Sequence, residues 1–118
     1  MTTLYERLGG TEVIRRIADD LVDLHANNPR IAPRFAGADL PALKKAAGDF
    51  FISGSGGPDV YEGGDMLTTH QGMNIDHAEF MAVLDDALEA LEQNGIGRRE
   101  QEEVLFILYS MRGQVVRV

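Results

Sequence analysis

The chain has 118 residues, of which 44% are hydrophobic and 25% are charged, as in ordinary globular domains. We therefore expect one domain, residues 1–118, with a single hydrophobic core. The formal net charge of −8 would repel a phosphate backbone, so we expect no nucleic-acid partner. We also expect a cytoplasmic protein with no membrane segment, because the chain lacks both a run of about 20 apolar residues and a basic N-terminal region followed by an apolar run.

The absence of cysteine excludes disulfides, iron–sulfur clusters, thiolate-ligated haem and cysteine nucleophiles. The three histidines, His25, His70 and His77, are then the only strong nitrogen or sulfur donors for a transition metal, apart from weak methionine thioethers.

Two helices are expected in the first part of the chain. Thr3 and Glu6 fit a capping box for a short helix that ends at residues 9–10. We expect Thr11 to cap the second helix, and we expect this helix to end at Asn27-Asn28-Pro29. Its apolar residues recur at helical spacing, and they are Val13, Ile14, Ile17, Ala18, Leu21, Val22 and Leu24.

A third helix follows an irregular stretch, residues 30–38, in which Pro33 interrupts regular structure and Phe35 is the one large apolar side chain. We expect Asp39 to cap this helix. Its predicted apolar face consists of Leu40, Leu43, Ala47, Phe50 and Phe51. Residues 53–64 are rich in glycine and serine and predict a long loop, which Tyr61, its only aromatic residue, is expected to anchor.

Residues 63–72 predict a short helix that carries one imidazole, with Asp65 placed to cap it and Gly72 placed to end it. His70, with Met66 one turn earlier on the same face, suits an iron ligand. A planar iron macrocycle between helices needs one protein nitrogen on one side and an open opposite side. From this stretch alone, a surface histidine on a short helix is the commoner outcome.

Two more helices complete the prediction. Asp76 and Glu79 fit a capping box at the start of the first helix, and we expect this helix to end at residues 94–95. The second helix is expected from about Arg98 to Gly113. Their inward apolar residues are Phe80, Val83, Leu84, Ala87, Leu88, Leu91, Val104, Leu105, Ile107, Leu108 and Met111. No segment shows strand alternation, so the predicted fold class is all-α.

Together these features resemble a truncated haemoglobin of the group-one type, a globin-like two-over-two helical sandwich. The matching residues are Leu4-Tyr5-Glu6-Arg7-Leu8-Gly9-Gly10, Phe35, Phe50-Phe51, Gly56-Gly57-Pro58, Tyr61, Met66, His70-Gln71-Gly72 and Phe80. Each motif is weak alone, but their joint order is specific. The resemblance implies a single truncated-globin domain over residues 1–118.

The resemblance also implies haem b, held without covalent attachment, with His70 as the proximal ligand and its other ring nitrogen donating to a carbonyl of the same helix. The implied pocket residues are Phe35, Leu43, Lys44, Ala47, Phe51, Tyr61 and Met66. Lys44 or Lys45 would pair with a haem propionate, although a solvated charge is the ordinary role of either. Plain core packing is an equally good reading of Leu43 and Phe51.

The chain departs from the family pattern on the distal side. The usual distal tyrosine falls on Val22, and the usual distal polar positions fall on Leu43 and Ala47, none of which can donate a hydrogen bond. A hydrogen bond to a charged acceptor contributes about 1.5–3 kcal/mol, so dioxygen is expected to bind roughly tenfold to hundredfold more weakly. An oxygen complex this short-lived disfavours dioxygenation of nitric oxide.

The other two histidines have open or peripheral roles. His25, one turn after Val22, could approach a ligand directly, through water or as a sixth iron ligand, but a half-exposed histidine near a helix C-terminus is the commoner case. His77, beside Asp76, is expected at the surface.

The implied function is reversible binding of a diatomic gas, O2, CO or NO. One alternative is a haem enzyme, NO-converting or peroxidase-like, that needs an external reductase because the chain has no flavin or nicotinamide motif. Another is a haem-poor sensor or structural globin, although we expect no fused output domain. Whether the protein is an enzyme stays open.

Overall fold

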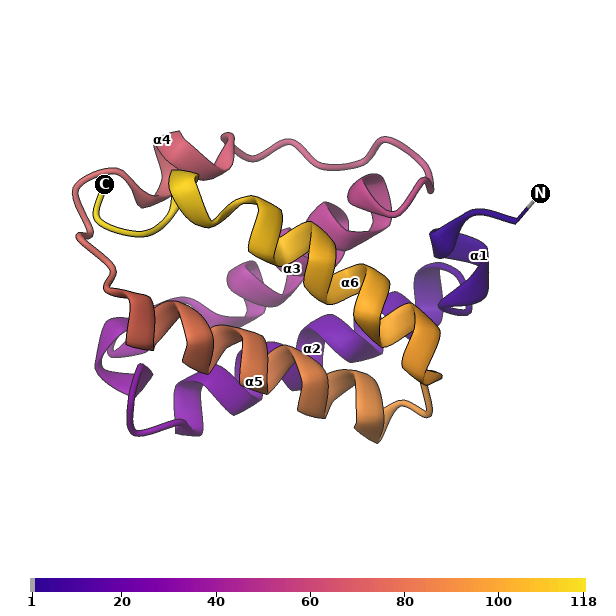
Figure 1. Ribbon diagram of the computed structural model, residues 1–118, viewed down its shortest axis with the longest axis horizontal. Coiled ribbons are helices and arrows are strands. Elements are labelled where there is room, and N and C mark those ends of the chain that lie inside the picture. The colour runs from indigo at the N-terminus through magenta and orange to yellow at the C-terminus, as the bar shows by residue number, and fades with distance from the viewer. Residues whose placement is uncertain (1) are drawn as a thin grey trace.

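Eight helical elements make up the computed structural model, which describes residues 2–118 (Figure 1). They are α1 (Leu4–Arg7), α2 (Thr11–Asn27), the 3-10 helix η1 (Ala32–Phe35), α3 (Leu40–Gly54), α4 (Met66–His70), α5 (His77–Gln93), α6 (Arg98–Ser110) and the 3-10 helix η2 (Arg112–Gln114). Within residues 2–118 the only β pairing is one isolated parallel bridge, between Ile75 and Val116. The predicted all-α class is confirmed, although the last helix ends at Ser110 and continues as η2 rather than reaching Gly113.

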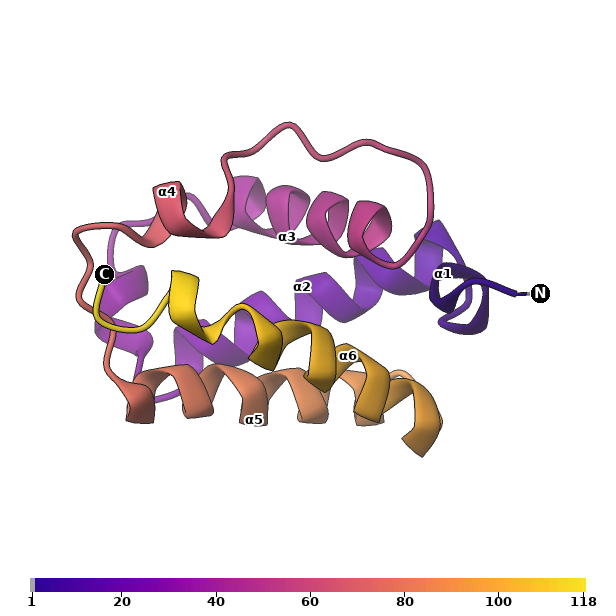
Figure 2. The same ribbon diagram turned by 45° about the horizontal axis from the view of Figure 1, so that its top comes forward.

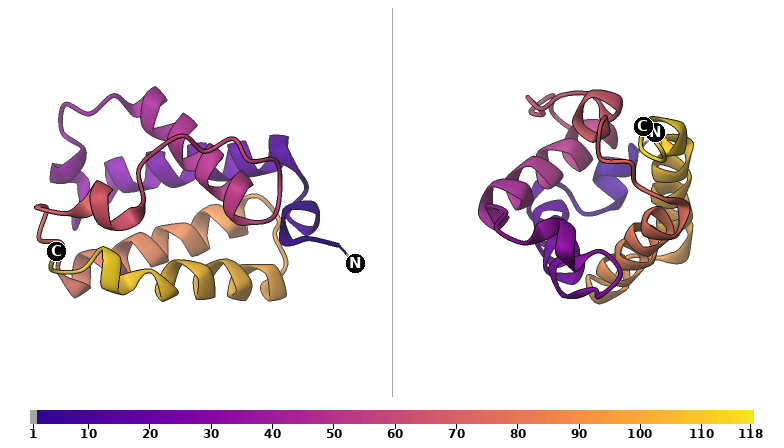
Figure 3. Two further views of the ribbon diagram at one scale, coloured as in Figure 1. Left: turned by 90° about the horizontal axis from the view of Figure 1, so that it is seen from above. Right: turned by 90° about the vertical axis from the view of Figure 1, so that its left-hand side faces the viewer.

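The four long helices form two layers, which Figure 2 shows from one side. Helix α2 packs along α3 and also against α5, and α5 packs against α6, while α3 and α6 make little direct contact. Seen from the end in Figure 3, the α2/α3 pair and the α5/α6 pair lie on opposite sides, with α4 at the top, between α3 and the C-terminal end of α6. This is a two-over-two arrangement. None of the helices within residues 2–118 is both long and apolar enough to cross a membrane.

The predicted N-caps are confirmed at four helices. Thr3, Asp39, Asp65 and Asp76 each accept a hydrogen bond from the backbone N–H three residues later, at 3.1, 3.1, 2.7 and 2.7 Å. The Glu79 carboxylate also accepts from the Asp76 N–H at 3.2 Å, which completes that capping box. Local sequence chemistry therefore determines where these helices begin.

The expected cap at Thr11 is wrong by one residue. The N-cap of α2 is Gly10, and Thr11 is the first helical residue. The backbone N–H of Thr11 donates instead to the hydroxyl of Tyr5 at 3.2 Å, and the Thr11 and Tyr5 hydroxyls lie 2.5 Å apart. A side chain from α1 thus satisfies a first-turn N–H that a local cap would otherwise satisfy.

The core consists of two apolar clusters. The larger joins α2, α3, α5 and α6, and its buried members are Leu8, Ile14, Ile17, Leu21, Ile52, Ala87, Ala90, Leu91 and Val104. The smaller lies near the C-terminal end of the chain and contains Ile75, Phe80, Leu84, Val115 and Val116.

Helix α3 does not bury the face that its sequence predicts. Its buried residues are Gly48, Asp49 and Ile52, whereas Leu43 stays 36% exposed. The prediction was wrong because α3 turns Gly48 and Asp49 toward α2, where a Cβ at Gly48 would lie in ordinary contact with Ala18, 3.7 Å away, and Asp49 pairs with Arg15. The apolar stripe of α3 is left only partly covered.

The loop after α3 is fastened at Tyr61, as predicted. Its hydroxyl donates to the Gly64 carbonyl at 2.8 Å, and its ring lies edge-on to Phe50 with centroids 5.4 Å apart. The hydroxyl oxygen of Ser53 accepts from the backbone N–H groups of Val60 and Tyr61, both at 3.0 Å. The loop is therefore held against α3 on its way to α4.

Candidate functional site

His70 is the last residue of α4, because the chain leaves the helix at Gln71 and turns at Gly72, where φ is +88°. Its Nδ1 lies 2.8 Å from the backbone carbonyl oxygen of Met66. A carbonyl oxygen can only accept, so Nδ1 carries the hydrogen and donates it. Nε2 is thereby left with its lone pair, as the prediction for the second ring nitrogen required.

This donor arrangement fits an iron ligand. Histidines that bind metals almost always donate the other ring N–H to a carbonyl or carboxylate, which fixes the tautomer and the orientation of the ring. The Asp65 cap and the Met66 carbonyl together hold the backbone and the imidazole of α4 in one rigid unit. His70 can therefore supply one directed nitrogen ligand to a haem iron.

The predicted wall residues are only partly buried. Ala47 and Phe51 of α3, Tyr61 of the loop, Met66 of α4 and Phe35 of η1 are all half-buried. Leu43 is 36% exposed, and Leu67 of α4 is 43% exposed. Apolar side chains that remain open on both α3 and α4 fit a large apolar group between these elements. Leu67 was missed in the sequence because nothing distinguishes it from an ordinary surface leucine.

The structure brings some of these residues into contact. Phe50 contacts Phe51 and Tyr61, and their ring centroids lie 5.7 and 5.4 Å away. Phe35 lies against His25, at a centroid distance of 5.6 Å. Met66 packs instead against the smaller core cluster.

The expectation of a half-exposed His25 is wrong. This side chain is buried, at 7% exposure, and its Nδ1 lies 2.7 Å from a carboxylate oxygen of Asp86 on α5. The amide of Asn28 donates to both oxygens of the same carboxylate, at 3.2 and 3.3 Å. Asp86 lies between Val83 and Ala87 on the inner side of α5. A charged residue at that position was the sequence signal that could have revealed the pair.

Burial lowers the pKa of His25 below its ordinary value, and this effect outweighs the opposite effect of the Asp86 carboxylate. The imidazole is therefore neutral at pH 7. Because Nδ1 donates its hydrogen to Asp86, Nε2 carries only a lone pair and cannot donate. His25 therefore cannot donate the hydrogen bond that the expected distal tyrosine, whose position falls on Val22, would have made.

The two lysines beside the candidate site already have acidic partners. Lys44 Nζ lies 3.0 Å from Asp23 on α2, which raises the pKa of Lys44, and Lys45 Nζ lies 2.7 Å from Asp49. A haem propionate would have to compete with Asp23 for Lys44. His77 is exposed as predicted and accepts from the guanidinium of Arg112 at 3.1 Å.

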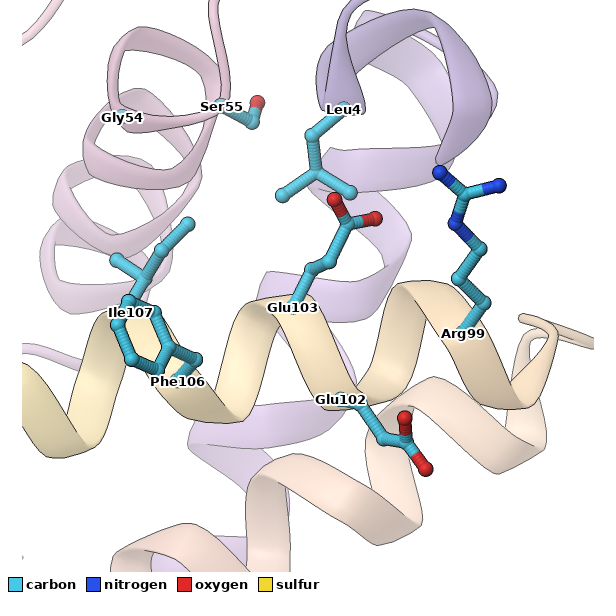
Figure 4. A pocket seen from close by; sticks show the side chains of 8 residues that line it. All are labelled: Leu4, Gly54, Ser55, Arg99, Glu102, Glu103, Phe106 and Ile107. Atoms are coloured by element: carbon cyan, nitrogen blue, oxygen red, sulfur yellow. The ribbon is translucent and has the colours of Figure 1, made fainter.

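A surface cavity of about 430 Å³ lies elsewhere, between α1, the end of α3 and α6. In Figure 4 Glu103 points toward Leu4 of α1, and Ile107 points toward Ser55. None of the predicted haem residues lines it. Two much smaller apolar cavities, of about 10 and 20 Å³, both border Phe51, Leu8 and Val104.

The fold and the single directed histidine define a class, the two-over-two helical globins. The sequence model described as "Bacterial-like globin" matches residues 3–117, so the chain belongs to the bacterial-like globin family. Group 1 truncated hemoglobin GlbN of Nostoc sp. (strain MUN 8820) is 29% identical over 116 residues, 98% of each chain. GlbN of Synechocystis sp. (strain ATCC 27184 / PCC 6803 / Kazusa) is 32% identical over 102 residues, 81% of each chain. The chain is a group-one truncated haemoglobin, as the resemblance indicated.

Solved structures agree on the fold. The truncated hemoglobin of Tetrahymena pyriformis in its Fe(III) form matches with a TM-score of 0.95 at 24% identity, covering 99% of this chain and 100% of that one. The hemoglobin of Chloroflexus aurantiacus matches with a TM-score of 0.87 at 26% identity, with the same coverage. The 2/2 hemoglobin of Synechococcus sp. PCC 7002, which has covalently attached heme, matches with a TM-score of 0.90 at 22% identity, covering 98% of each chain. Globins of this family bind haem and small gases.

Proposed function

We propose that residues 1–118 form a single truncated-globin domain that binds haem b without a covalent bond, through His70, and reversibly takes up a diatomic gas. The observation that carries the proposal is the hydrogen bond from His70 Nδ1 to the Met66 carbonyl, which leaves Nε2 available to iron. The haem supplies the iron to which the gas binds.

The chain's own residues provide the surroundings of that iron. The apolar side chains that α3 and α4 leave open would cover the macrocycle and keep water away from it, and they include Leu43, Ala47, Phe51 and Met66. Phe35 would pack on the distal side, and Tyr61 would hold the loop against the edge. Lys44 would exchange its Asp23 partner for a propionate.

The distal side is proposed to be apolar. Val22 is buried at 4% exposure, Leu43 and Ala47 carry no polar group, and the neutral His25 cannot donate. Without a donor, dioxygen loses about 1.5–3 kcal/mol of stabilisation, whereas carbon monoxide and nitric oxide lose less because they are less polar when bound. A short-lived oxygen complex suits a gas carrier or scavenger.

Absorption spectra of the ferric, ferrous and carbonyl forms test the haem site. We expect a Soret band in the wild type and in the control His77→Ala, whose side chain is exposed, and its loss in His70→Ala. Extraction with acidified acetone should remove the haem, because no covalent bond retains it. Colourless protein from haem-replete cells, or an unchanged Soret band in His70→Ala, would show that the assignment is wrong.

Stopped-flow oxygen dissociation tests the distal side. We expect a fast off-rate and rapid autoxidation in the wild type. An off-rate as slow as that of relatives with a distal tyrosine would contradict the apolar pocket. His25→Leu would then show whether His25 is the donor after all.

A further inference from the structure

The last four residues, 115–118, run beside the segment that follows His70. The backbone N–H groups of Gly72 and Asn74 both donate to the Val118 carbonyl oxygen, at 3.1 Å, and the N–H of Arg117 donates to the Ile75 carbonyl oxygen at 2.8 Å. Figures 1 and 2 both show this end of the chain next to α4. We call residues 115–118 the C-terminal strap. Its first bond lies only two residues after His70.

Helix α4 has little else to hold it. It is five residues long, and its main packing partner is η2, which leads directly into the strap. In the sequence, α4 is preceded by the glycine-rich loop that ends at Asp65, and this loop is largely exposed. The hydrogen bond of the His70 ring lies within α4 itself, so it fixes the ring to the helix but not the helix to the protein.

The side chains of the strap continue this support. Val115 and Val116 are each 9% exposed and are buried with Ile75, and Met66 packs against the same cluster. Met66 is also the residue whose carbonyl accepts from His70. An unbroken chain of contacts therefore runs from the strap, through Met66, to the imidazole.

We propose that the C-terminal strap is a positioning element for His70: it holds α4 in place, and thereby sets how firmly the imidazole can bind iron. This inference rests on the proposed role of His70. Because Arg117 lies outside the candidate pocket, the strap can be loosened there without changing any residue of that pocket.

Arg117 is the position at which the strap can be tightened or loosened, because its side chain is exposed and its φ is +57°, in the left-handed region. Glycine adopts this conformation freely, whereas a β-branched residue is strongly disfavoured there. Arg117→Gly should therefore tighten the strap and Arg117→Val should loosen it. Arg16, exposed on α2, is the matched control, because in a helix the order is reversed and glycine is the more destabilising substitution.

Two readouts follow the bond between His70 and iron: the fraction of the ferrous nitrosyl form in which the proximal bond is broken, and the rate of haem transfer to apomyoglobin. We expect both to rise in the order Arg117→Gly, wild type, Arg117→Val, with haem transfer about tenfold faster in Arg117→Val than in Arg117→Gly. The Arg16 variants should match the wild type in the nitrosyl form. Equal values in all Arg117 variants, or the same changes at Arg16, would overturn the proposal.

Amide hydrogen exchange of Gly72 and Asn74 in the haem-free chain separates the strap from the haem assignment. Exchange at both amides should be faster in Arg117→Val than in the wild type. If exchange responds while His70→Ala still binds haem normally, the role of His70 fails and the strap merely holds a loop. If exchange does not respond, the strap itself is refuted. Arg117→Ala, with a smaller conformational penalty, replaces the valine variant should that fail to fold.

Discussion

Replacing His25 by leucine is expected to destabilise the fold, because the change leaves a carboxylate buried with one partner fewer. Asp86 is 6% exposed and accepts from His25 at 2.7 Å. Its remaining donor, the Asn28 amide, is farther away, at 3.2 and 3.3 Å. Leucine fills most of the space of the imidazole, so the loss is mainly electrostatic.

Removing the hydrogen-bond partner of a buried polar group costs about 1–3 kcal/mol, and more when the group that is left carries a charge, as the Asp86 carboxylate does. Because Asn28 still donates to both Asp86 oxygens, we expect about 2–3 kcal/mol for His25→Leu, which is a large part of the roughly 5–15 kcal/mol that stabilises an ordinary domain. The melting temperature should fall by about 10 °C. In His25→Leu/Asp86→Leu no charge remains buried, so the stability should return to within about 1 kcal/mol of the wild type.

The pair also predicts a pH dependence. The pKa of His25 is lowered in the fold, so below its unfolded value of about 6.5 the unfolded chain takes up a proton that the native imidazole resists. The stabilisation is therefore fully present above about pH 6.5 and is lost as the pH falls through the lower, folded pKa. The wild type should lose more stability between pH 7 and pH 5 than the double variant does.

Urea unfolding followed by circular dichroism, on the haem-free and the haem-loaded chain, measures these quantities. If the double variant is as unstable as His25→Leu, the stranded carboxylate is not the cause. A loss below about 1 kcal/mol in His25→Leu would likewise refute the reasoning.

Three further substitutions test other parts of the structure. Leu43→Gln places a donor on a partly exposed distal position and should slow oxygen dissociation about tenfold while leaving carbon monoxide dissociation nearly unchanged, as measured by stopped flow. Gly57→Ala should destabilise the fold by about 1–3 kcal/mol in urea, because the new Cβ would lie 2.4 Å from the Tyr5 ring, whereas Gly54→Ala, with nothing within 4 Å, should be neutral or slightly stabilising. Tyr5→Phe removes the hydroxyl that accepts from the Thr11 N–H and should lower the free energy of unfolding by about 1 kcal/mol.

The helix boundaries were largely predictable because they depend on local chemistry. A carboxylate or hydroxyl three residues before a free N–H is visible in the sequence, and Asp39, Asp65 and Asp76 cap as expected. The exception, Thr11, failed because its partner Tyr5 comes from another helix. The same limit applies to His25, since its position one turn after Val22 does not show that Asp86 of another helix lies opposite.

The candidate site was predictable to a similar depth. The cap at Asp65 and the hydrogen bond from His70 to Met66 are contacts within one turn of helix, so the sequence alone could suggest them. The C-terminal strap was not foreseen. It joins residues about 45 positions apart through backbone atoms, whose pairing no side-chain pattern encodes.

The mistaken face of α3 is informative about function. A helix that packs only against protein buries its apolar stripe, yet α3 buries Gly48 and Asp49 against α2 and leaves Leu43 partly exposed. Asp49 is compensated there by Arg15, at 2.9 Å, so the polar contact with α2 is satisfied rather than accidental. The chain therefore leaves Leu43 partly open while a charged residue packs against α2, which fits the proposal that a group other than protein covers this part of α3. The haem that this family binds, which we propose His70 holds, is a flat apolar group of this kind.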